Sequence, residues 1–185
     1  SIFNGIEMKS LTPKDGIPNY PIQKLFKDSK GNVWAGAFTS KSSDLGLVKI
    51  DPDMKITPYY YSENVPIQNI NAIAEDDYGR MIFGGSAGLT IMDDDKVINY
   101  DYADGMGSGW VLSVMPEGKN IWIGTQIGLV LYNGKKFKTY NTDDGLAGNN
   151  INSIVKSPKG EIWIATDSDV YILSVNNPQI RNSNE

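Results

Sequence analysis

The chain contains neither cysteine nor histidine among its 185 residues. Without cysteine, a disulfide framework, a thiolate metal site and a cysteine nucleophile are all excluded. Without histidine, the commonest general base and the commonest metal ligand are missing too, and no Ser–His–Asp triad can form within the chain. The sequence therefore predicts a protein that is not an enzyme and that uses no metal and no cofactor.

Two further shortages narrow the range of partners. The net charge is −5 and no basic stripe is present, so nucleic acid is not an expected partner. No run of apolar residues approaches the roughly 20 needed to cross a bilayer, so we expect no membrane segment within this chain. The hydrophobic content of 40% and the 19 glycines indicate a globular domain that is rich in turns.

One phrase recurs along the chain. Its four copies are residues 32–36 (NVWAG), 80–84 (RMIFG), 120–125 (NIWIGT) and 161–166 (EIWIAT). Their central residues are Trp34, Ile82, Trp122 and Trp163, at intervals of 48, 40 and 41 residues. A repeat of about 40 residues built from short strands and turns is typical of β-propeller blades. We expect the central residues to pack between blades rather than to bind a ligand.

Each unit is predicted to hold four short antiparallel strands. An apolar strand opens the unit, the repeated phrase forms the second strand, and polar turns separate the others. Asn133-Gly134 between two apolar segments is the strongest hairpin signal. No segment shows helical periodicity. The predicted fold class is all-β: a β-propeller made of four-stranded antiparallel blades, with four blades per chain.

The repeat also predicts the blade boundaries. The blades would occupy residues 15–60, 61–101, 102–141 and 142–174, followed by a polar tail at 175–185. The last unit shows no clear fourth strand, whereas residues 1–14 match the fourth strand of the third unit and its loop. We therefore expect residues 1–14 to complete the last blade and to bury Met8 and Leu11 there.

This arrangement bears on assembly. We expect a homodimer, through strand exchange or through completion of a ring by two chains, slightly ahead of a closed four-blade monomer. A third alternative is that the chain is part of a larger ring.

The later units resemble a known family. The phrases at 122–129 (WIGTQIGL), 132–140 and 144–154 are similar to the two-component regulator propeller repeat. The first two units depart from it, with Ala35 and Phe83 in place of the usual isoleucine and Ala37 and Gly85 in place of the usual threonine. The resemblance implies the periplasmic or extracellular sensor region of a bacterial hybrid two-component histidine kinase, which senses carbohydrate breakdown products.

Candidate binding residues fall in the loops at one end of the predicted blades, where propellers commonly bind ligands. Trp110 would stack on a sugar ring, and Phe38 and Lys41 lie in a loop that is longer in the first unit than in the others. Amide and carboxylate groups would hydrogen-bond sugar hydroxyls. The predicted ligand-binding residues are Trp110, Gln126, Asn150, Asn69, Phe38, Lys41 and Asp167. Inter-blade packing of Trp110, a neutral loop insertion and plain solvation of the polar residues remain alternatives.

The predicted function is that of a non-catalytic sensor fragment for a small polar ligand such as a saccharide. One alternative is a secreted or periplasmic protein-interaction propeller without a small ligand, and a third is a propeller lyase or glycan-active enzyme. Glycoside chemistry would need two carboxylates converging on one pocket. The acids predicted near the loop end are Asp15, Asp44, Glu63, Asp104, Asp144 and Asp167.

Overall fold

The computed structural model describes residues 2–3, 5–39, 41, 43–62, 66–94, 96–173 and 180–182. They form four four-stranded antiparallel sheets, in each of which consecutive strands lie side by side. The predicted fold class is confirmed. We call the sheets blades 1 to 4.

The strands follow the predicted order. Blade 1 holds β3 (Ile22–Lys27), β4 (Val33–Ala37), β5 (Leu45–Ile50) and β6 (Ile56–Tyr60). Blade 2 holds β7 (Ala72–Glu75), β8 (Met81–Gly85), β9 (Gly88–Asp93) and β10 (Lys96–Tyr100). Blade 3 holds β11 (Val111–Glu117), β12 (Asn120–Thr125), β13 (Leu129–Tyr132) and β14 (Phe137–Tyr140). Blade 4 holds β15 (Ser153–Lys156), β16 (Ile162–Ala165), β17 (Val170–Leu173) and β18 (Ile180–Asn182).

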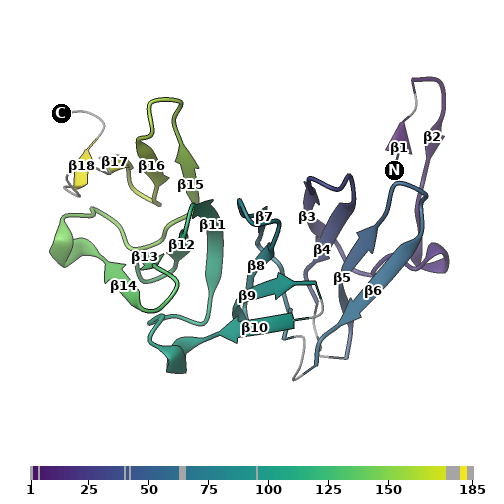
Figure 1. Ribbon diagram of the computed structural model, residues 1–185, viewed down its shortest axis with the longest axis horizontal. Helices are drawn as coiled ribbons and strands as arrows, with labels where there is room; N and C mark the ends of the chain where they lie inside the picture. Colours follow the sequence, from purple (N-terminus) through teal and green to yellow (C-terminus); the bar gives the residue numbers. More distant parts are fainter. Residues whose placement is uncertain are drawn as a thin grey trace.

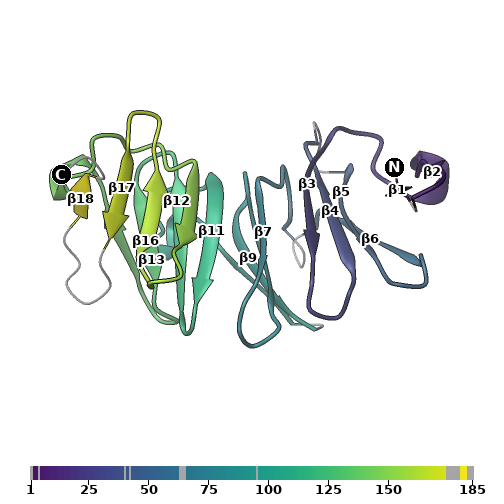
Figure 2. The same cartoon turned by 90° about the horizontal axis from the view of Figure 1, so that it is seen from above.

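The blades stand side by side in an open arc (Figure 1). The first strands of neighbouring blades contact one another, β3 with β7, β7 with β11, and β11 with β15, and they line the concave side of the arc. Blade 1 and blade 4 lie at opposite ends of the long axis, and both views place the two chain termini there too (Figures 1 and 2).

The two chain ends differ from the prediction. The fourth strand of blade 4 is β18, which pairs with β17 and comes from the segment expected to be a polar tail. The N-terminus instead folds into a hairpin of β1 (Ile2–Phe3) and β2 (Met8–Lys9) beside blade 1. Met8 is 68% exposed, and Leu11 packs against the apolar cluster of blade 1. The predicted completion of blade 4 by residues 1–14 is therefore wrong, because β18 already occupies that edge.

The core lies between blades. Trp34 of β4 packs against Phe83 of β8, with ring centroids 5.3 Å apart, and Trp122 of β12 packs into the apolar cluster of blade 4. Their side chains are only 3% and 4% exposed. Each buried indole N–H donates to a carboxylate, Trp34 to Asp28 at 2.8 Å and Trp122 to Glu117 at 3.1 Å. The predicted packing role of these two tryptophans is confirmed.

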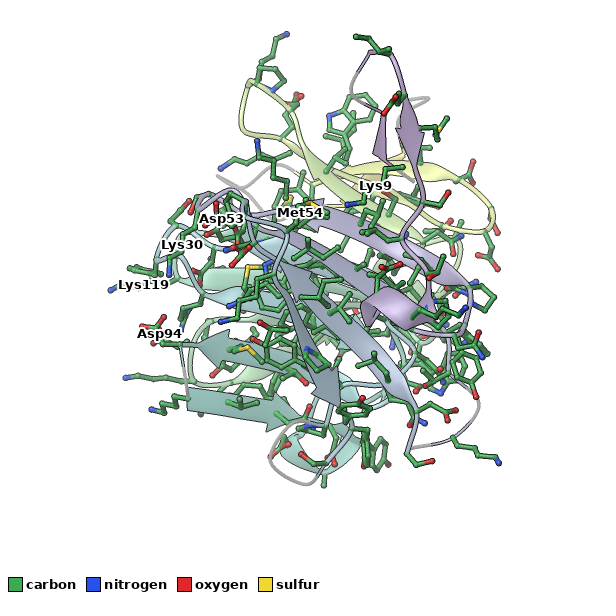
Figure 3. The ribbon with its side chains drawn as sticks, turned by 90° about the vertical axis from the view of Figure 1, so that its right-hand side faces the viewer. Lys9, Lys30, Asp53, Met54, Asp94 and Lys119 are labelled. Carbon is green, nitrogen blue, oxygen red and sulfur yellow. The ribbon has the colours of Figure 1, made fainter. Side chains whose placement is uncertain are left out.

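Polar contacts join neighbouring blades at the end that carries the hairpin turns after the first strands. Ser29 donates to Glu75 from both its N–H and its hydroxyl, and Lys156 forms an ion pair with Glu117 at 2.5 Å. Seen from the blade 1 end, Lys30, Asp94 and Lys119 lie along this same edge (Figure 3). These contacts join neighbouring sheets at one end of the blades, and the loops between the second and third strands lie at the opposite end.

Candidate functional site

The loops that enter the first strands and the loops that follow the second strands lie at the same end of the blades. At the junction of blades 3 and 4 this is set by backbone pairing around one residue. Val111 pairs with Thr125, and the N–H of Ile151 donates to the carbonyl of Thr125 at 2.9 Å. The chain neighbours of these three residues therefore converge. They are Trp110, Gln126 and Asn150, which come from three loops.

Trp110 presents its ring to solvent at this point. Its side chain is 41% exposed, although Trp34 and Trp122 are buried. Its backbone is held in place by Ser108, whose hydroxyl accepts from the Trp110 N–H at 3.1 Å and donates to the Trp110 carbonyl at 3.4 Å. The indole is thus exposed on a backbone that is fixed by local hydrogen bonds.

Asn150 has a buried acceptor without a donor. Its Oδ1 atom has no hydrogen-bond partner within the described part of the chain. A buried acceptor that stays unpaired costs about 1–3 kcal/mol, so a donor supplied by a ligand or a bound water would stabilise this site.

Asp167 extends the same group of side chains. Its Oδ1 occupies the space beside Gly148, where an added Cβ would meet it at 2.3 Å. Because Gly148 is two residues from Asn150, the exposed carboxylate lies over the loop that carries Asn150. We call Trp110, Gln126, Asn150 and Asp167 the blade 3–4 loop cluster.

Asn69 and Phe38 lie at a different junction, between blades 1 and 2. Asn69 adopts a left-handed backbone conformation (φ 49°) and accepts from the Thr39 N–H at 2.7 Å. Its amide also donates to Ser86 at 3.1 Å, so its polar atoms serve the fold. Phe38 is 43% exposed beside this network.

Lys41 follows Phe38 by three residues in the chain. It is exposed on the long loop of blade 1, and its N–H donates to Asp44 at 2.8 Å. Of the seven predicted residues, four thus lie in loops at the blade 3–4 junction, two lie at the blade 1–2 junction, and Lys41 lies on the long loop of blade 1.

A larger hollow of about 590 Å³ lies beside blade 1, between the loop at 13–20 and strands β5 and β6. Its lining includes Asp15, Asp44, Tyr20 and Tyr60. We did not predict the two tyrosines as site residues. For Tyr60, the sequence held a signal that could have been used, namely the run of tyrosines at 59–61. Tyr59 packs inward against Trp34, and successive side chains of a strand point to opposite faces, so Tyr60 points away from that core.

The two acids in this hollow are engaged as hydrogen-bond acceptors. The Asp15 carboxylate accepts from the N–H and the hydroxyl of Thr12, both at 2.8 Å, and the Thr12 backbone contact lowers the pKa of Asp15. Asp44 accepts from Lys41. A general acid for glycoside cleavage needs a raised pKa, which is the opposite of the shift at Asp15.

The remaining predicted acids do not join them. Asp104 and Asp144 cap their own loops, accepting from the N–H groups of Asp101 at 2.9 Å and Asn141 at 3.0 Å. These loops begin with the short helices η2 (Tyr102–Asp104) and η3 (Thr142–Asp144), which match η1 (Pro13–Asp15) of blade 1. Glu63 lies outside the described residues. In the ranges that the structure covers, no cluster of three or more acidic side chains is suited to hold a metal ion.

Comparison with known proteins bears on blade 4 first. Residues 145–168 match the family model for the two-component regulator propeller. This segment is a two-component regulator propeller repeat. It contains Asn150 and Asp167 of the blade 3–4 loop cluster, and it runs through β15 and β16. A comparison with curated proteins finds no significant match.

Solved structures match the arc as a whole. The extracellular domain of a hybrid two-component system from B. thetaiotaomicron superposes with a TM-score of 0.74 at 19% identity, over 91% of this chain and 25% of that one. A second such domain from B. thetaiotaomicron gives a TM-score of 0.71 at 19% identity, over 87% of this chain and 22% of that one. The repeat protein thus spans about a quarter of these domains.

A propeller enzyme is similar in fold as well. The virginiamycin B lyase of Staphylococcus aureus superposes with a TM-score of 0.64 at 14% identity, over 85% of this chain and 53% of that one. At these identities the matches establish the propeller fold. No described helix of the repeat protein is long and apolar enough to span a membrane.

Proposed function

We propose that this chain is a non-catalytic sensor module that binds a small saccharide at the blade 3–4 loop cluster. The observation that carries the proposal is that an exposed indole, Trp110, lies at the same blade junction as Asn150, whose buried Oδ1 has no hydrogen-bond partner among the described residues. These two groups supply the two kinds of contact that a sugar needs, an apolar surface and a directed hydrogen bond.

The chemistry of the cluster suits a sugar ring. The apolar face of a pyranose stacks on an aromatic side chain, and its hydroxyls both donate and accept hydrogen bonds. Because Asn150 Oδ1 is buried, a bound water would donate to it and would in turn contact a ligand hydroxyl. The exposed amide of Gln126 offers a donor and an acceptor, while the Asp167 carboxylate accepts only.

Two observations support a role without catalysis. Asp15, Asp28 and Glu117 all have a pKa below the usual value, whereas a general acid needs a raised one. In the similar lyase of Staphylococcus aureus, replacing one histidine by alanine gives a catalytically inactive protein. The present chain contains no histidine.

The similar solved domains support an extracellular or periplasmic location and a place in a two-component system. In that setting the arc would present its loop end to the ligand, and the rest of a longer protein would carry the signal. The loops suit this role because rigid blades hold them while their sequences vary freely.

A library of mono- and oligosaccharides, screened against the chain by saturation-transfer NMR, tests the proposal. We expect at least one saccharide to receive saturation from the wild type and to lose it with Trp110→Ala. Phe38→Ala is the matched control, because Phe38 is a similarly exposed aromatic residue at the blade 1–2 junction. If no saccharide binds, or if Trp110→Ala binds as the wild type does, the proposed site is wrong.

A further inference from the structure

Among the described residues, each end of the arc presents an exposed apolar sheet face. On blade 1, Leu25 is 71% exposed and Ile22 is 37% exposed, and a groove of about 470 Å³ runs between Leu11, Val33 and Ile50. Figure 3 looks onto this end, with Met54 of the groove labelled. On blade 4, Val155 is 57% exposed, and Trp163 and Ile172 are half-buried. Inside the arc, the matching faces are covered by the next blade.

The strand registers show that these faces are complementary. Leu25 pairs with Ala35 as Ile154 pairs with Ile164, so Leu25 occupies in blade 1 the place of Ile154 in blade 4. Ile154 is only 6% exposed because it is packed in the cluster that contains Trp122 of blade 3. The blade 1 face is therefore equivalent to the blade 4 face against which Trp122 of the preceding blade packs.

The exposed blade 4 face is equivalent to the blade 3 face that carries Trp122. Trp163 lies between Val155 and Ile172 across its strands, as Trp122 lies between Met115 and Leu131. Met115 and Leu131 pack against the blade 3–4 core. The chain thus carries both halves of an inter-blade contact, one at each end.

Charge complementarity gives the contact a direction. Between blades 3 and 4, Glu117 accepts from the Trp122 indole and also forms an ion pair with Lys156. At the free end of blade 4, Glu161 accepts from the Trp163 indole at 3.4 Å. At the free end of blade 1, the exposed Lys27 occupies the register of Lys156, since they pair with Val33 and Ile162, respectively. An incoming blade 1 would bring Lys27 towards Glu161.

We infer that blade 4 of one chain docks onto blade 1 of a second copy, and that two identical contacts of this kind close a two-fold ring of eight blades. A contact between different faces forms a closed assembly when the rotation between copies returns to its start, and two half-rings satisfy this condition. Ala165 replaces the glycine found at Gly36, Gly84 and Gly124. Its methyl group would hold the incoming blade further away at this point than neighbouring blades lie inside the arc. This inference is independent of the saccharide site.

Light scattering coupled to size exclusion, at micromolar concentrations, tests this inference with charge-reversal variants. We expect the wild type to elute at twice the mass of one chain. Lys27→Glu and Glu161→Lys should each shift it to the monomer, because each places like charges at both contacts. Lys119→Glu, at an exposed turn of blade 3, is the matched control and should stay dimeric.

Mixing the two variants separates a lost contact from a lost fold. In a dimer of one Lys27→Glu chain and one Glu161→Lys chain, both contacts again join opposite charges, so the mixture should recover the dimer mass. If the wild type eluted at the mass of one chain, the inference would be overturned, because the exposed faces of blades 1 and 4 would then not be covered by a second copy. Assemblies that grow beyond two copies, or a mixture that stays monomeric, would equally overturn it.

Discussion

Replacing Gly84 by alanine tests how closely neighbouring blades must approach. A Cβ at Gly84 would lie 2.3 Å from Val111 Cγ1 and 3.0 Å from Val111 Cβ. Val111 is fully buried at the start of β11 in the next blade, and its β-branched side chain has few alternative rotamers. The added methyl group therefore has to push the two blades apart.

Such overpacking costs about 1–3 kcal/mol. In a domain of this size, each kcal/mol shifts the Tm by about 2–4 °C. We therefore expect Gly84→Ala to lower the Tm by about 2–12 °C, measured by far-ultraviolet circular dichroism during heating.

A control and a rescue make the result specific. Ala165→Gly changes the corresponding position of blade 4 and removes a methyl group without creating a clash, so it should cost only the strand preference, about 0.5–1 kcal/mol. In the double variant Gly84→Ala with Val111→Ala, the clash is removed, so the loss should be smaller than the sum of the two single losses. A Gly84→Ala variant that melts with the wild type, or a double variant whose losses add within about 0.5 kcal/mol, would refute the reasoning.

Other contacts make further predictions. Burial raises the pKa of Glu117, but hydrogen bonds from Lys156 and Trp122 outweigh it, so the folded pKa lies below 4.5. The Glu117 contribution to the free energy of unfolding is thus complete above about pH 4.5 and is lost as the pH falls further. Below that pH, the urea midpoint of Glu117→Gln should therefore depend less on pH than the midpoint of the wild type. An equal dependence on pH in both proteins would contradict this. Burial and the Tyr100 hydroxyl raise the pKa of Tyr132 to about 12. The stability that the protonated Tyr132 hydroxyl contributes is therefore lost as the pH rises from about 10 to 12. Ultraviolet titration should show the Tyr132 pKa falling towards 10 in Tyr100→Phe, whereas an unchanged late-titrating tyrosine rejects the assignment. Asn69→Ala should cost about 1–3 kcal/mol in urea unfolding, because it leaves the buried Thr39 without its acceptor; a loss no greater than that of Phe38→Ala speaks against that role.

Much of the blade architecture could be predicted because packing between blades imposes a pattern on each repeat. Trp34 and Trp122 must be large and apolar since each fills the gap to the next sheet. The glycines near the ends of the second strands are equally constrained, because Ile70, which leads into the first strand of the next blade, leaves no room for a Cβ at Gly36.

The fourth strand of blade 4 could not be predicted on the same grounds. The residues Ile180, Arg181 and Asn182 show no run of alternating apolar positions, and an outermost strand pairs on one side only. The likeness of residues 4–11 to an outer strand reflected a real turn, since Gly5 has a φ of 95°. Turn chemistry fixes where a chain reverses, but it does not say which sheet edge the strand joins.

The candidate site was predictable in part. Asn69 and Asn150 hold the same position in the repeat and differ in their partners. The first accepts from Thr39 at the start of the long blade 1 loop, whereas the Oδ1 atom of the second has no donor among the described residues. That difference depends on the course of a neighbouring loop, which the repeat pattern does not encode.

The central claim is that the blade 3–4 loop cluster binds a saccharide, and the most direct test is isothermal titration with the tightest binder from the library. Trp110→Ala should weaken binding by about 1–3 kcal/mol with an unchanged Tm, because it removes the stacking surface and leaves the core intact. Asn150→Ala should also weaken binding, and Phe38→Ala should bind as the wild type does. Equal affinities for the wild type and Trp110→Ala would contradict the account.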